Sequence, residues 1–318
     1  MQRDRDAAIP QPLRDWLQTV RAAKAAALAG GYRITIVNTR ETFEGITRGL
    51  VTERPEVALV RDDVIAAPGY PVPVRIYHPA PDEPRPVALF LHGGGHVSGG
   101  VAMYDPLVRK LALATGRIIV SVEYRLAPEC PYPAGLMDCM AAAKRVHRCL
   151  DGLDLPHAPN LALIGDSGGG ALAASIAHLA QFEPGLAIEA LVLLYPSLDY
   201  TLSQPSVMEN GEGYVLERER MLWMFDSYLL GQQNRRDISP LFMDITPAFP
   251  RTLVVTAEFD PLRDEGAAYV QRLQEHGIAA ERLHMPGLLH AYLNLEDLVP
   301  EQCRETYAAL GAFLARRG

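Results

Sequence analysis

A serine flanked by glycines is the residue of this chain best suited to act as a nucleophile. Gly165, Ser167 and Gly169 form a G-x-S-x-G motif between the apolar run 161–164 and a helical pattern. A nucleophile at a strand-to-helix turn has a strained backbone and needs small neighbours two residues away on each side. The start of the helix also favours the negative charge that develops during attack. The motif therefore predicts acyl transfer.

Glycine-rich turns between a strand and a helix also bind nucleotide phosphates. The dinucleotide-binding pattern requires G-x-G-x-x-G at the first strand-to-helix turn and an acidic ribose partner further on. The turn at Ser167 lies late in the chain and has a different spacing. The nucleophile is the favoured interpretation, because a second glycine motif upstream supports it.

The second motif is His92-Gly93-Gly94-Gly95, directly after the apolar run 87–91. Backbone amides in a turn without side chains can converge on the oxyanion of an acyl-transfer intermediate. A lone glycine turn would indicate only flexibility, but its pairing with a downstream nucleophile motif makes the oxyanion role specific. We expect a structural role for His92, hydrogen-bonded within its own loop.

An activated serine also needs a carboxylate that orients its general base. Asp260 lies just past the apolar run 253–257, at a strand end where sheet-borne catalytic residues belong. Asp264 and Glu265 begin the next helix, where negative charge favours the helix N-terminus. Glu258 is expected to be structural. Asp260 is therefore the predicted acid.

The base is expected after the acid, because the order on this kind of sheet is serine, acid, histidine. His290 lies thirty residues after Asp260, in a loop beyond the last predicted strand. His276 lies at a helix end and His284 inside a short predicted strand, so solvated or core roles suit them better. The predicted catalytic residues are Ser167, Asp260 and His290.

The elements that must position these residues alternate between strands and helices. Short apolar runs separated by helical patterns are typical of strands buried on both faces of a parallel sheet. An antiparallel pair is expected at 57–64 and 72–77. The other predicted strands are 87–91, 118–122, 161–164, 190–194, 253–257 and 283–285. The predicted helices among them are 104–115, 134–150, 169–181, 265–277 and 300–316.

Helical segments also lie outside this alternation. Apolar residues recur at helical spacing within 12–28, and a second helix is expected over 40–50. We therefore divide the chain into an N-terminal helical arm at 1–50 and a catalytic α/β domain at 51–318. An insertion without strands around 200–240 interrupts this domain, and such long insertions are commonly lids.

The composition excludes several other classes of protein. The 318 residues include 30 Lys and Arg against 38 Asp and Glu, a formal net charge of −8 that disfavours nucleic acids and anionic membranes. No secretory h-region and no uncharged stretch of about 18 apolar residues is present. The four cysteines form no C-x-x-C pair, so we expect neither a metal site nor disulfides. A cytoplasmic protein without stable membrane association is the prediction.

The motifs HGGG, EYRLAPE, GDSGGG, AEFDPLRDEG and GLLHAY, in this order, resemble the hormone-sensitive-lipase-like branch of the α/β-hydrolases (bacterial family IV). This branch includes bacterial acetyl esterases and related carboxylesterases. The resemblance runs from about residue 57 to the C-terminus. It implies an α/β-hydrolase fold, with a mostly parallel eight-stranded sheet flanked by helices. It also implies a helical cap formed by the N-terminal arm and the insertion.

Carried over residue by residue, the resemblance implies the same nucleophile, acid and base. It implies that the EYRLAPE stretch braces the active site through Arg125 and Glu129, which on their own would be an i, i+4 charge pair. The implied oxyanion donors are the amides of Gly94, Gly95 and Gly168. The supporting motif residues are His92, Gly93, Gly165 and Gly169.

The chain departs from the family's pattern at two positions. Gly168 follows the nucleophile where alanine is usual, which keeps the amide and predicts a looser turn. His96 replaces the usual aromatic residue after HGGG and predicts a more polar pocket wall. Apolar residues at helical spacing on the insertion more often indicate packing than pocket lining. The expected substrate pocket lies around His96, Tyr195, Met221 and Phe225.

The predicted function is a serine carboxylesterase that hydrolyses short- to medium-chain acyl esters through an acyl-enzyme intermediate. This chemistry needs no metal and no organic cofactor. The same residues could act on a lactone, thioester, carbamate or amide, and a non-catalytic small-molecule receptor is a further alternative. The expected partner is a small-molecule ester and no nucleic acid. The sequence leaves open whether the chain is a monomer or a homodimer.

Overall fold

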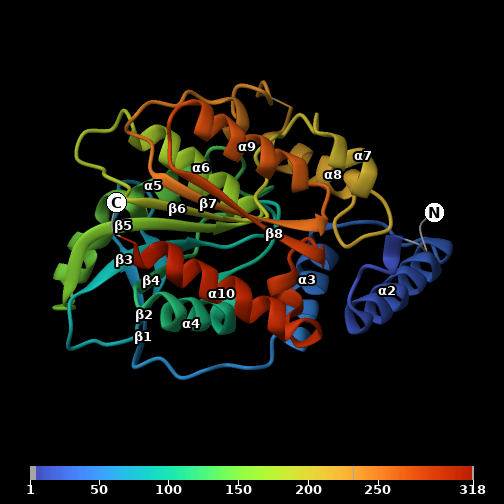
Figure 1. The fold of residues 1–318 in the computed structure, drawn as a ribbon, viewed down its shortest axis with the longest axis horizontal. Coiled ribbons are helices and arrows are strands. Elements are labelled where there is room, and N and C mark those ends of the chain that lie inside the picture. The colour runs from blue at the N-terminus through green and yellow to red at the C-terminus, as the bar shows by residue number, and fades with distance from the viewer. Residues whose placement is uncertain (1–4, 232, 317–318) are drawn as a thin grey trace.

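A twisted sheet forms the centre of the computed structural model, which describes residues 5–231 and 233–316 (Figure 1). The eight strands follow the order β1-β2-β4-β3-β5-β6-β7-β8. The pair β1–β2 is antiparallel and the sheet is mostly parallel, as predicted, and the pair β2–β4 is also antiparallel. The strands are β1 (Leu59–Ile65), β2 (Val72–His78), β3 (Arg85–Leu91), β4 (Ile118–Val122), β5 (His157–Asp166), β6 (Ala190–Leu194), β7 (Arg251–Phe259) and β8 (Ala280–Leu289).

The central strands are apolar because both of their faces are covered. Every residue of β4 and β6 is buried. Successive side chains of a strand point to opposite faces, so Leu89 and Phe90 of β3 enter two different apolar clusters. The parallel register of β3 and β5 places Leu91 opposite Gly165. The two strand ends that carry the glycine motifs are therefore neighbours.

Helices cover both faces of the sheet, as Figure 1 shows. One face carries α5, α6 and α9, and the other carries α4 and α10. The bounds are α4 (Val101–Thr115), α5 (Ala134–Asp151), α6 (Gly168–Ala180), α9 (Arg263–Glu275) and α10 (Pro300–Ala315). Two short 3₁₀ helices, η1 (Pro240–Phe242) and η2 (Tyr292–Leu298), precede β7 and α10. This layering is the predicted α/β architecture.

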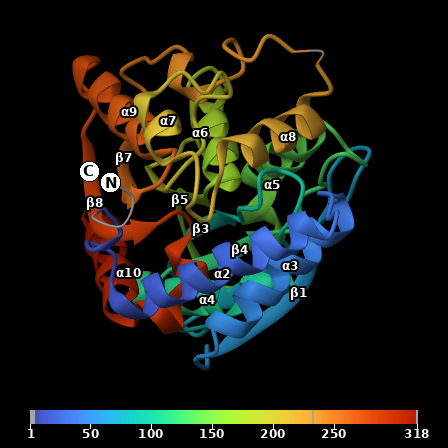
Figure 2. The same cartoon turned by 90° about the vertical axis from the view of Figure 1, so that its right-hand side faces the viewer.

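Two further groups of helices lie beyond the carboxyl ends of the parallel strands (Figure 2). The N-terminal segment supplies α2 (Gln11–Ala29) and α3 (Ile36–Leu50), seen below the strand ends in this view. The segment between β6 and β7 supplies α7 (Pro205–Asn210) and α8 (Arg218–Leu229), seen above them. The two groups therefore flank the edge of the sheet at which catalytic residues were expected.

Several elements are longer than predicted, among them β3, β5, β7 and α4, and the reason is clearest for α3 and β8. Helix α3 begins at Ile36, ahead of the expected residue 40, because Thr35 and Asn38 form a capping box with reciprocal hydrogen bonds of 2.9 and 3.2 Å. Strand β8 spans ten residues instead of 283–285. It lies at the edge of the sheet, where exposed polar positions interrupt the apolar run that the prediction followed.

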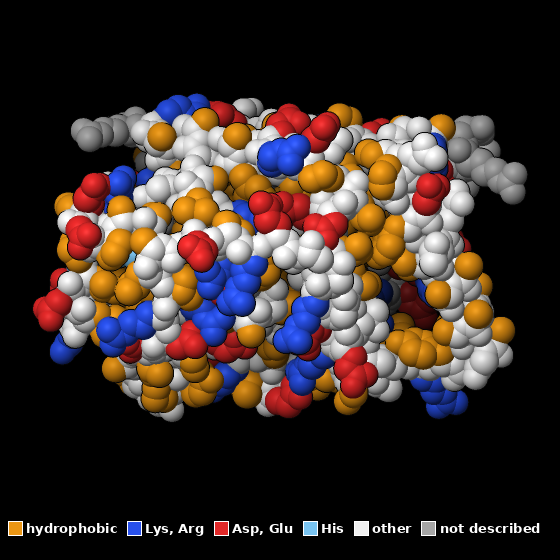
Figure 3. All heavy atoms as spheres, turned by 90° about the horizontal axis from the view of Figure 1, so that it is seen from below, with side chains coloured by type: hydrophobic (Ala, Val, Ile, Leu, Met, Phe, Trp, Pro, Cys, Tyr) orange, Lys and Arg blue, Asp and Glu red, His pale blue; other side chains and the backbone are white. Residues whose placement is uncertain are grey.

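The length of the helices and the charge of the surface can be compared with the prediction that the protein binds neither membranes nor nucleic acids. None of the described helices combines the length and the apolar character that a bilayer crossing requires. Figure 3 shows acidic and basic side chains interspersed on the face over α4 and α10. On α4, for example, Asp105 pairs with Arg54 at 2.6 Å and with Arg109 at 2.8 Å. This face therefore lacks, over the described residues, the extended basic surface typical of nucleic-acid binding.

Candidate active site

Ser167 lies at the sharp turn between β5 and α6. Its φ of 51° and ψ of −118° form a conformation that residues other than glycine rarely adopt. The Ser167 N–H donates to the Leu194 carbonyl at 2.9 Å, which ties the turn to β6. A Cβ on Gly169 would overlap the carbonyl oxygens of Leu91 and His92. The loop after β3 thus packs directly on this turn, and only glycine allows that contact.

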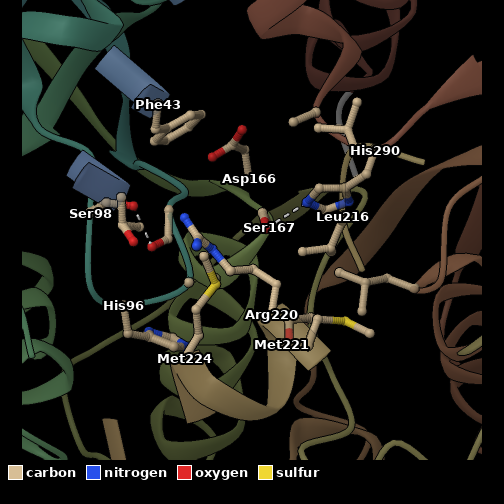
Figure 4. Close-up of a pocket in the computed structure, with 18 of the residues that line it drawn as sticks. Phe43, His96, Ser98, Asp166, Ser167, Leu216, Arg220, Met221, Met224 and His290 are labelled. Carbon is tan, nitrogen blue, oxygen red and sulfur yellow. Dashed lines mark hydrogen bonds between the residues drawn. The ribbon is translucent and has the colours of Figure 1, made fainter. Parts of the chain in front are cut away.

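Ser167, His290 and Asp260 lie in direct hydrogen-bond contact, each just after the end of a parallel strand. Ser167 Oγ donates to His290 Nε2 at 2.9 Å (Figure 4), and His290 Nδ1 donates to Asp260 Oδ2 at 2.8 Å. Because a carboxylate only accepts, the proton is held on Nδ1 and Nε2 is left to accept. Asp260 is fully buried, and its Oδ1 accepts the Leu262 N–H at 2.8 Å. The structure thus brings together the three residues selected by spacing.

Asp264 and Glu265, the alternatives to Asp260 at the start of α9, make hydrogen bonds and ion pairs outside the catalytic relay. Glu265 is fully buried, and its Oε1 accepts the Leu198 N–H at 2.6 Å. Burial raises the pKa of Glu265 well above its usual range. The expectation that it serves as a helix N-terminal charge is therefore wrong. Asp264 pairs with Arg263 at 2.8 Å and accepts the Ser206 N–H at 2.9 Å, which ties α9 to α7.

The remaining rivals also lie away from Ser167. The ring of His276 is exposed at the end of α9, and His284 Nδ1 hydrogen-bonds with Thr256 Oγ1 at 3.1 Å. Glu258 accepts the Gly287 N–H at 2.7 Å. This contact is structural, and it holds the end of β8 close to β7.

The loop after β3 reaches the nucleophile turn through its glycines. Gly94 and Gly95 have φ values of 117° and 61°, which suit glycine, and both line the same pocket as Ser167. A Cβ on Gly168 would lie 3.2 Å from the amide nitrogens of Gly95 and His96. Gly168 therefore permits a close approach of the loop.

Buried side chains beneath the loop hold it in place. His92 Nδ1 donates to the Gly93 carbonyl at 2.8 Å, and its ring stacks on Tyr124 with centroids 4.3 Å apart. Asp166 is fully buried and accepts the Tyr104 hydroxyl at 3.1 Å. Burial raises the pKa of Asp166 to about 6. Asp166 and Tyr104 were not among the predicted site residues, because only the folded contacts connect them.

A cavity of about 170 Å³ opens on Ser167 and His290 (Figure 4). Its wall is mainly apolar and combines segments far apart in the sequence. Helix α3 contributes Phe43 and Ile46, which sequence patterns did not place at the site. The contributions of α8 are Arg220, Met221, Met224 and Phe225.

The predicted pocket residues divide into two groups. His96, Met221 and Phe225 line the cavity. Tyr195 is absent from the lining that the described residues form, so its expected place in the pocket is wrong. It is 1% exposed, and its ring packs edge-on against His290 with centroids 5.2 Å apart. It supports the histidine from the core side.

His96 contributes a stacked aromatic ring to the pocket wall. Its ring stacks on Tyr228 with centroids 3.9 Å apart and an interplanar angle of 10°. The Tyr200 hydroxyl hydrogen-bonds with His96 Nε2 at 3.1 Å. Burial lowers the pKa of His96 to about 3, so the ring is neutral near pH 7. The polar wall expected from this departure is a neutral stacked imidazole.

The EYRLAPE stretch braces the site through partners on other helices. Arg125 pairs with Asp138 of α5 at 2.7 Å, and Glu129 pairs with Arg40 of α3 at 2.7 Å. The i, i+4 pair between Arg125 and Glu129 is therefore wrong. Arg40 Nε also donates to the Val97 carbonyl at 2.8 Å, within the loop that follows the glycine motif. Arg40 is a positioning residue with no motif in the sequence to reveal it.

Comparison with known proteins agrees with this architecture. The sequence matches the family described as alpha/beta hydrolase fold over residues 88–294. It is 36% identical over 252 residues to carboxylesterase NlhH of Mycobacterium tuberculosis, covering 76% of this chain and 77% of that protein. It is 31% identical over 297 residues to ethyl acetate hydrolase of Pseudomonas putida, covering 91% and 93%.

Solved structures lead to the same group. The hyperthermophilic esterase of the archaeon Pyrobaculum calidifontis superimposes with a TM-score of 0.81 at 34% identity, covering 88% of this chain and 93% of that one. The chain belongs to the α/β-hydrolase family, in the hormone-sensitive-lipase-like branch that its motifs resemble. The predicted fold and family are confirmed.

Proposed function

We propose that this chain is a carboxylic ester hydrolase that cleaves short- to medium-chain acyl esters through an acyl-enzyme intermediate on Ser167. The observation that carries the proposal is the hydrogen-bonded relay from Ser167 through His290 to Asp260, which opens on the pocket. The names of the relatives, among them a carboxylesterase and an ethyl acetate hydrolase, support ester cleavage as the activity.

In the first half-reaction Ser167 Oγ attacks the ester carbonyl carbon while His290 Nε2 takes the hydroxyl proton. The resulting imidazolium is stabilised by the buried Asp260 carboxylate, which is already hydrogen-bonded to Nδ1. When the tetrahedral intermediate collapses, the bond to the alcohol oxygen breaks and His290 returns the proton to that oxygen. The products of this step are the free alcohol and an ester on Ser167.

In the second half-reaction a water molecule replaces the alcohol. His290 takes a proton from the water, whose oxygen attacks the acyl carbon. The bond to Ser167 Oγ then breaks, and His290 returns the proton to the serine. The carboxylic acid leaves, and the relay is restored without a metal or an organic cofactor.

The negative oxygen of both tetrahedral intermediates needs donors that are fixed in advance. We assign this role to the amides of Gly94, Gly95 and Gly168. Support comes from the packing of the loop on Gly168, where an added Cβ would lie 3.2 Å from the Gly95 amide nitrogen, and from the shared pocket lining. Preorganised donors of this kind are typically worth several kcal/mol in the transition state.

The dimensions of the pocket support a small acyl group. A cavity of about 170 Å³ with a mainly apolar wall suits a short hydrocarbon chain. We propose that the arm at 1–50 and the insertion around 200–240 together form the cap over it.

A lactone, thioester, carbamate or amide would pass through the same oxyanion, so these compounds stay alternative substrates. A non-catalytic small-molecule receptor would not need the hydrogen-bonded relay of Ser167, His290 and Asp260, so the relay favours an enzyme over a receptor.

The test is hydrolysis of p-nitrophenyl esters from acetate to palmitate by the wild type and Ser167→Ala. We expect a maximum at short or medium chains and a loss of roughly 10⁴-fold or more in kcat for the variant, since removing the nucleophile disables the whole relay. In parallel, diethyl p-nitrophenyl phosphate should leave one diethylphosphoryl group on the peptide that contains Ser167. Mass spectrometry of the digested protein detects this added group.

Ser175→Ala is the matched control, because Ser175 is buried on α6 but lies outside the pocket. It should keep wild-type activity. Substantial esterase activity in Ser167→Ala, or phosphorylation of a different residue, would contradict the assignment. A folded wild type that cleaves none of the esters would favour the alternative substrates or the receptor.

A further inference from the structure

Among the described residues that line the mainly apolar pocket, one carries an arginine side chain. Arg220 lies on α8, and Figure 4 shows its side chain leaving the helix and pointing into the cavity. Arg220 lines the same cavity as Ser167 and His290. The chemistry proposed above uses no positive side chain at this place. Its presence therefore requires a separate explanation.

No acidic residue in the described part of the chain pairs with Arg220. The nearby Glu217 is already engaged, in an ion pair with Lys24 of α2. Asp226, later on α8, pairs with Arg235 at 2.5 Å. Among the described residues, Arg220 has neither a salt bridge nor a hydrogen bond to protein. Its donors are left for water or for a ligand.

Of the described residues that line the cavity, one is acidic, and it is also engaged elsewhere. Asp166 is fully buried and accepts the Tyr104 hydroxyl at 3.1 Å. Arg220 itself contacts the ring of Trp223, with its guanidinium carbon 5.3 Å from the ring centroid. A cation–π contact uses the face of the guanidinium and leaves its five N–H donors free in the plane.

The surroundings leave the charge of Arg220 poorly compensated. Burial lowers the pKa of the Arg220 guanidinium, while the Tyr32 hydroxyl and the Glu217 carboxylate oppose that effect only in part. Arginine stays protonated at neutral pH even so. A half-buried, unpaired guanidinium is costly unless an anion joins it, and its planar fork matches a carboxylate in two parallel hydrogen bonds.

We propose that Arg220 binds a carboxylate carried by the ester substrate, so that the preferred substrates are esters with a second, ionised carboxyl group. Half-esters of dicarboxylic acids carry that group on the acyl side, and acyloxy acids carry it on the alcohol side. The inference rests on the proposed ester hydrolysis at Ser167 and specifies its substrate class. Arg220 is thereby the specificity-determining residue of the pocket.

The net negative charge of the whole molecule gives an anionic substrate no attraction at long range, so the local contact with Arg220 matters more. With a formal net charge of −8 the protein does not attract anions at a distance. An anionic ester therefore gains its electrostatic attraction inside the pocket, at Arg220. Neutral esters of the same size use only the apolar wall. The preference between the two substrate types should thus depend on this one residue.

The experiment compares matched pairs of neutral and anionic esters. On the acyl side the pair is p-nitrophenyl pentanoate and mono-p-nitrophenyl glutarate, which replaces the terminal methyl group with a carboxylate. On the alcohol side the pair is methyl 4-acetoxybenzoate and 4-acetoxybenzoate. Values of kcat/KM are measured for the wild type, Arg220→Met and Arg220→Lys. Arg218→Met is the control, because Arg218 is exposed on the same helix and lies outside the cavity.

We expect Arg220→Met to lower kcat/KM for the anionic ester of at least one pair by about 10- to 100-fold, the usual worth of a charge-assisted hydrogen bond. The neutral ester of that pair should change less than about threefold. Arg220→Lys should keep part of the preference, because it keeps the charge but loses the fork. Arg218→Met should resemble the wild type with all four esters.

Equal losses for both members of each pair would show that Arg220 only supports the cap, and they would overturn the proposal. An unchanged preference in Arg220→Met would overturn it as well. In both cases the wild type still hydrolyses esters, so the proposed function survives. Failure of the wild type on all four esters would instead count against the function at Ser167.

Discussion

Two carboxylates near Ser167 are equally buried but make different contacts. Asp260 accepts hydrogen bonds from the Leu262 N–H and from His290. Asp166 accepts a hydroxyl from Tyr104, and burial raises its pKa to about 6. Asp260 is thus suited to stabilise a positive imidazole, whereas Asp166 supports the loop and changes its protonation within a mildly acidic range.

Asp166→Asn should therefore change how stability depends on pH. The pKa of Asp166 is about 6 in the folded state against an ordinary 3.8, so the folded state holds the proton more tightly. The free energy of unfolding of the wild type then falls, relative to the Asn variant, as pH rises from about 4 to 6. The shift corresponds to a relative change of up to about 3 kcal/mol.

Urea unfolding of both proteins at pH 4, 5, 6 and 7 measures that difference. The exposed Asp82, changed to Asn, serves as a control whose difference from the wild type should stay constant. A constant difference for Asp166→Asn as well would mean that the Asp166 carboxyl is not perturbed in the folded protein.

At the scale of elements, the N-terminal helices and the loops after β3 and β4 depend on Arg40. Its guanidinium joins α3 to the Val97 carbonyl at 2.8 Å, to the Ala127 carbonyl at 3.2 Å and to the Glu129 carboxylate. Ala127 N in turn donates to the His96 carbonyl at 2.9 Å. The position of the glycine loop is therefore coupled to a helix of the N-terminal arm, 57 residues earlier in the sequence.

Arg40→Met should be much more harmful than Glu129→Gln. The first change leaves two carbonyl oxygens without a donor, which should cost about 2 to 3 kcal/mol of stability. It should also lower kcat, because the loop next to Ser167 loses a support. The second change removes only an exposed ion pair, worth less than about 1 kcal/mol.

Chemical unfolding and kcat for p-nitrophenyl butyrate measure both effects. If Glu129→Gln destabilised the protein as much as Arg40→Met, the ion pair and not the carbonyl contacts would be the important part of the junction.

The strands and most helices could be predicted because each produces a local pattern. The apolar runs at 118–122 and 190–194 match β4 and β6 at both ends. Edge strand β8 was underestimated, since its exposed residues interrupt the apolar run. Ser167, Asp260 and His290 could be selected because strand ends and chain order constrain them. Residues that meet only in the folded state, such as Phe43 and Arg220, leave no local pattern to detect.

At the scale of the whole molecule, α10 closes the fold by packing on α4, and Gly311 is at their contact. A Cβ on Gly311 would overlap the Ala114 carbonyl oxygen, whereas a Cβ on Gly45 of α3 would meet open space. The same substitution should therefore have opposite effects at these two helical glycines.

Gly311→Ala should lower the free energy of unfolding by about 1 to 3 kcal/mol, because the two helices must separate. Gly45→Ala should raise it by roughly 0.5 to 1 kcal/mol through lower chain entropy in the unfolded state. Thermal and urea unfolding give both values. Stabilisation by Gly311→Ala would show that α10 and α4 are not in close contact.

The packing of the arm against the end of the chain also sets an order of events during synthesis. Ile9 and Leu13 share a buried cluster with Leu288, and Thr47 hydrogen-bonds with Asn294 at 3.3 Å. The two helices of the arm therefore reach these packing partners only after residues 288–294 have been synthesised. A nascent chain shorter than this has neither the complete pocket nor His290. We therefore expect no esterase activity until translation has passed His290.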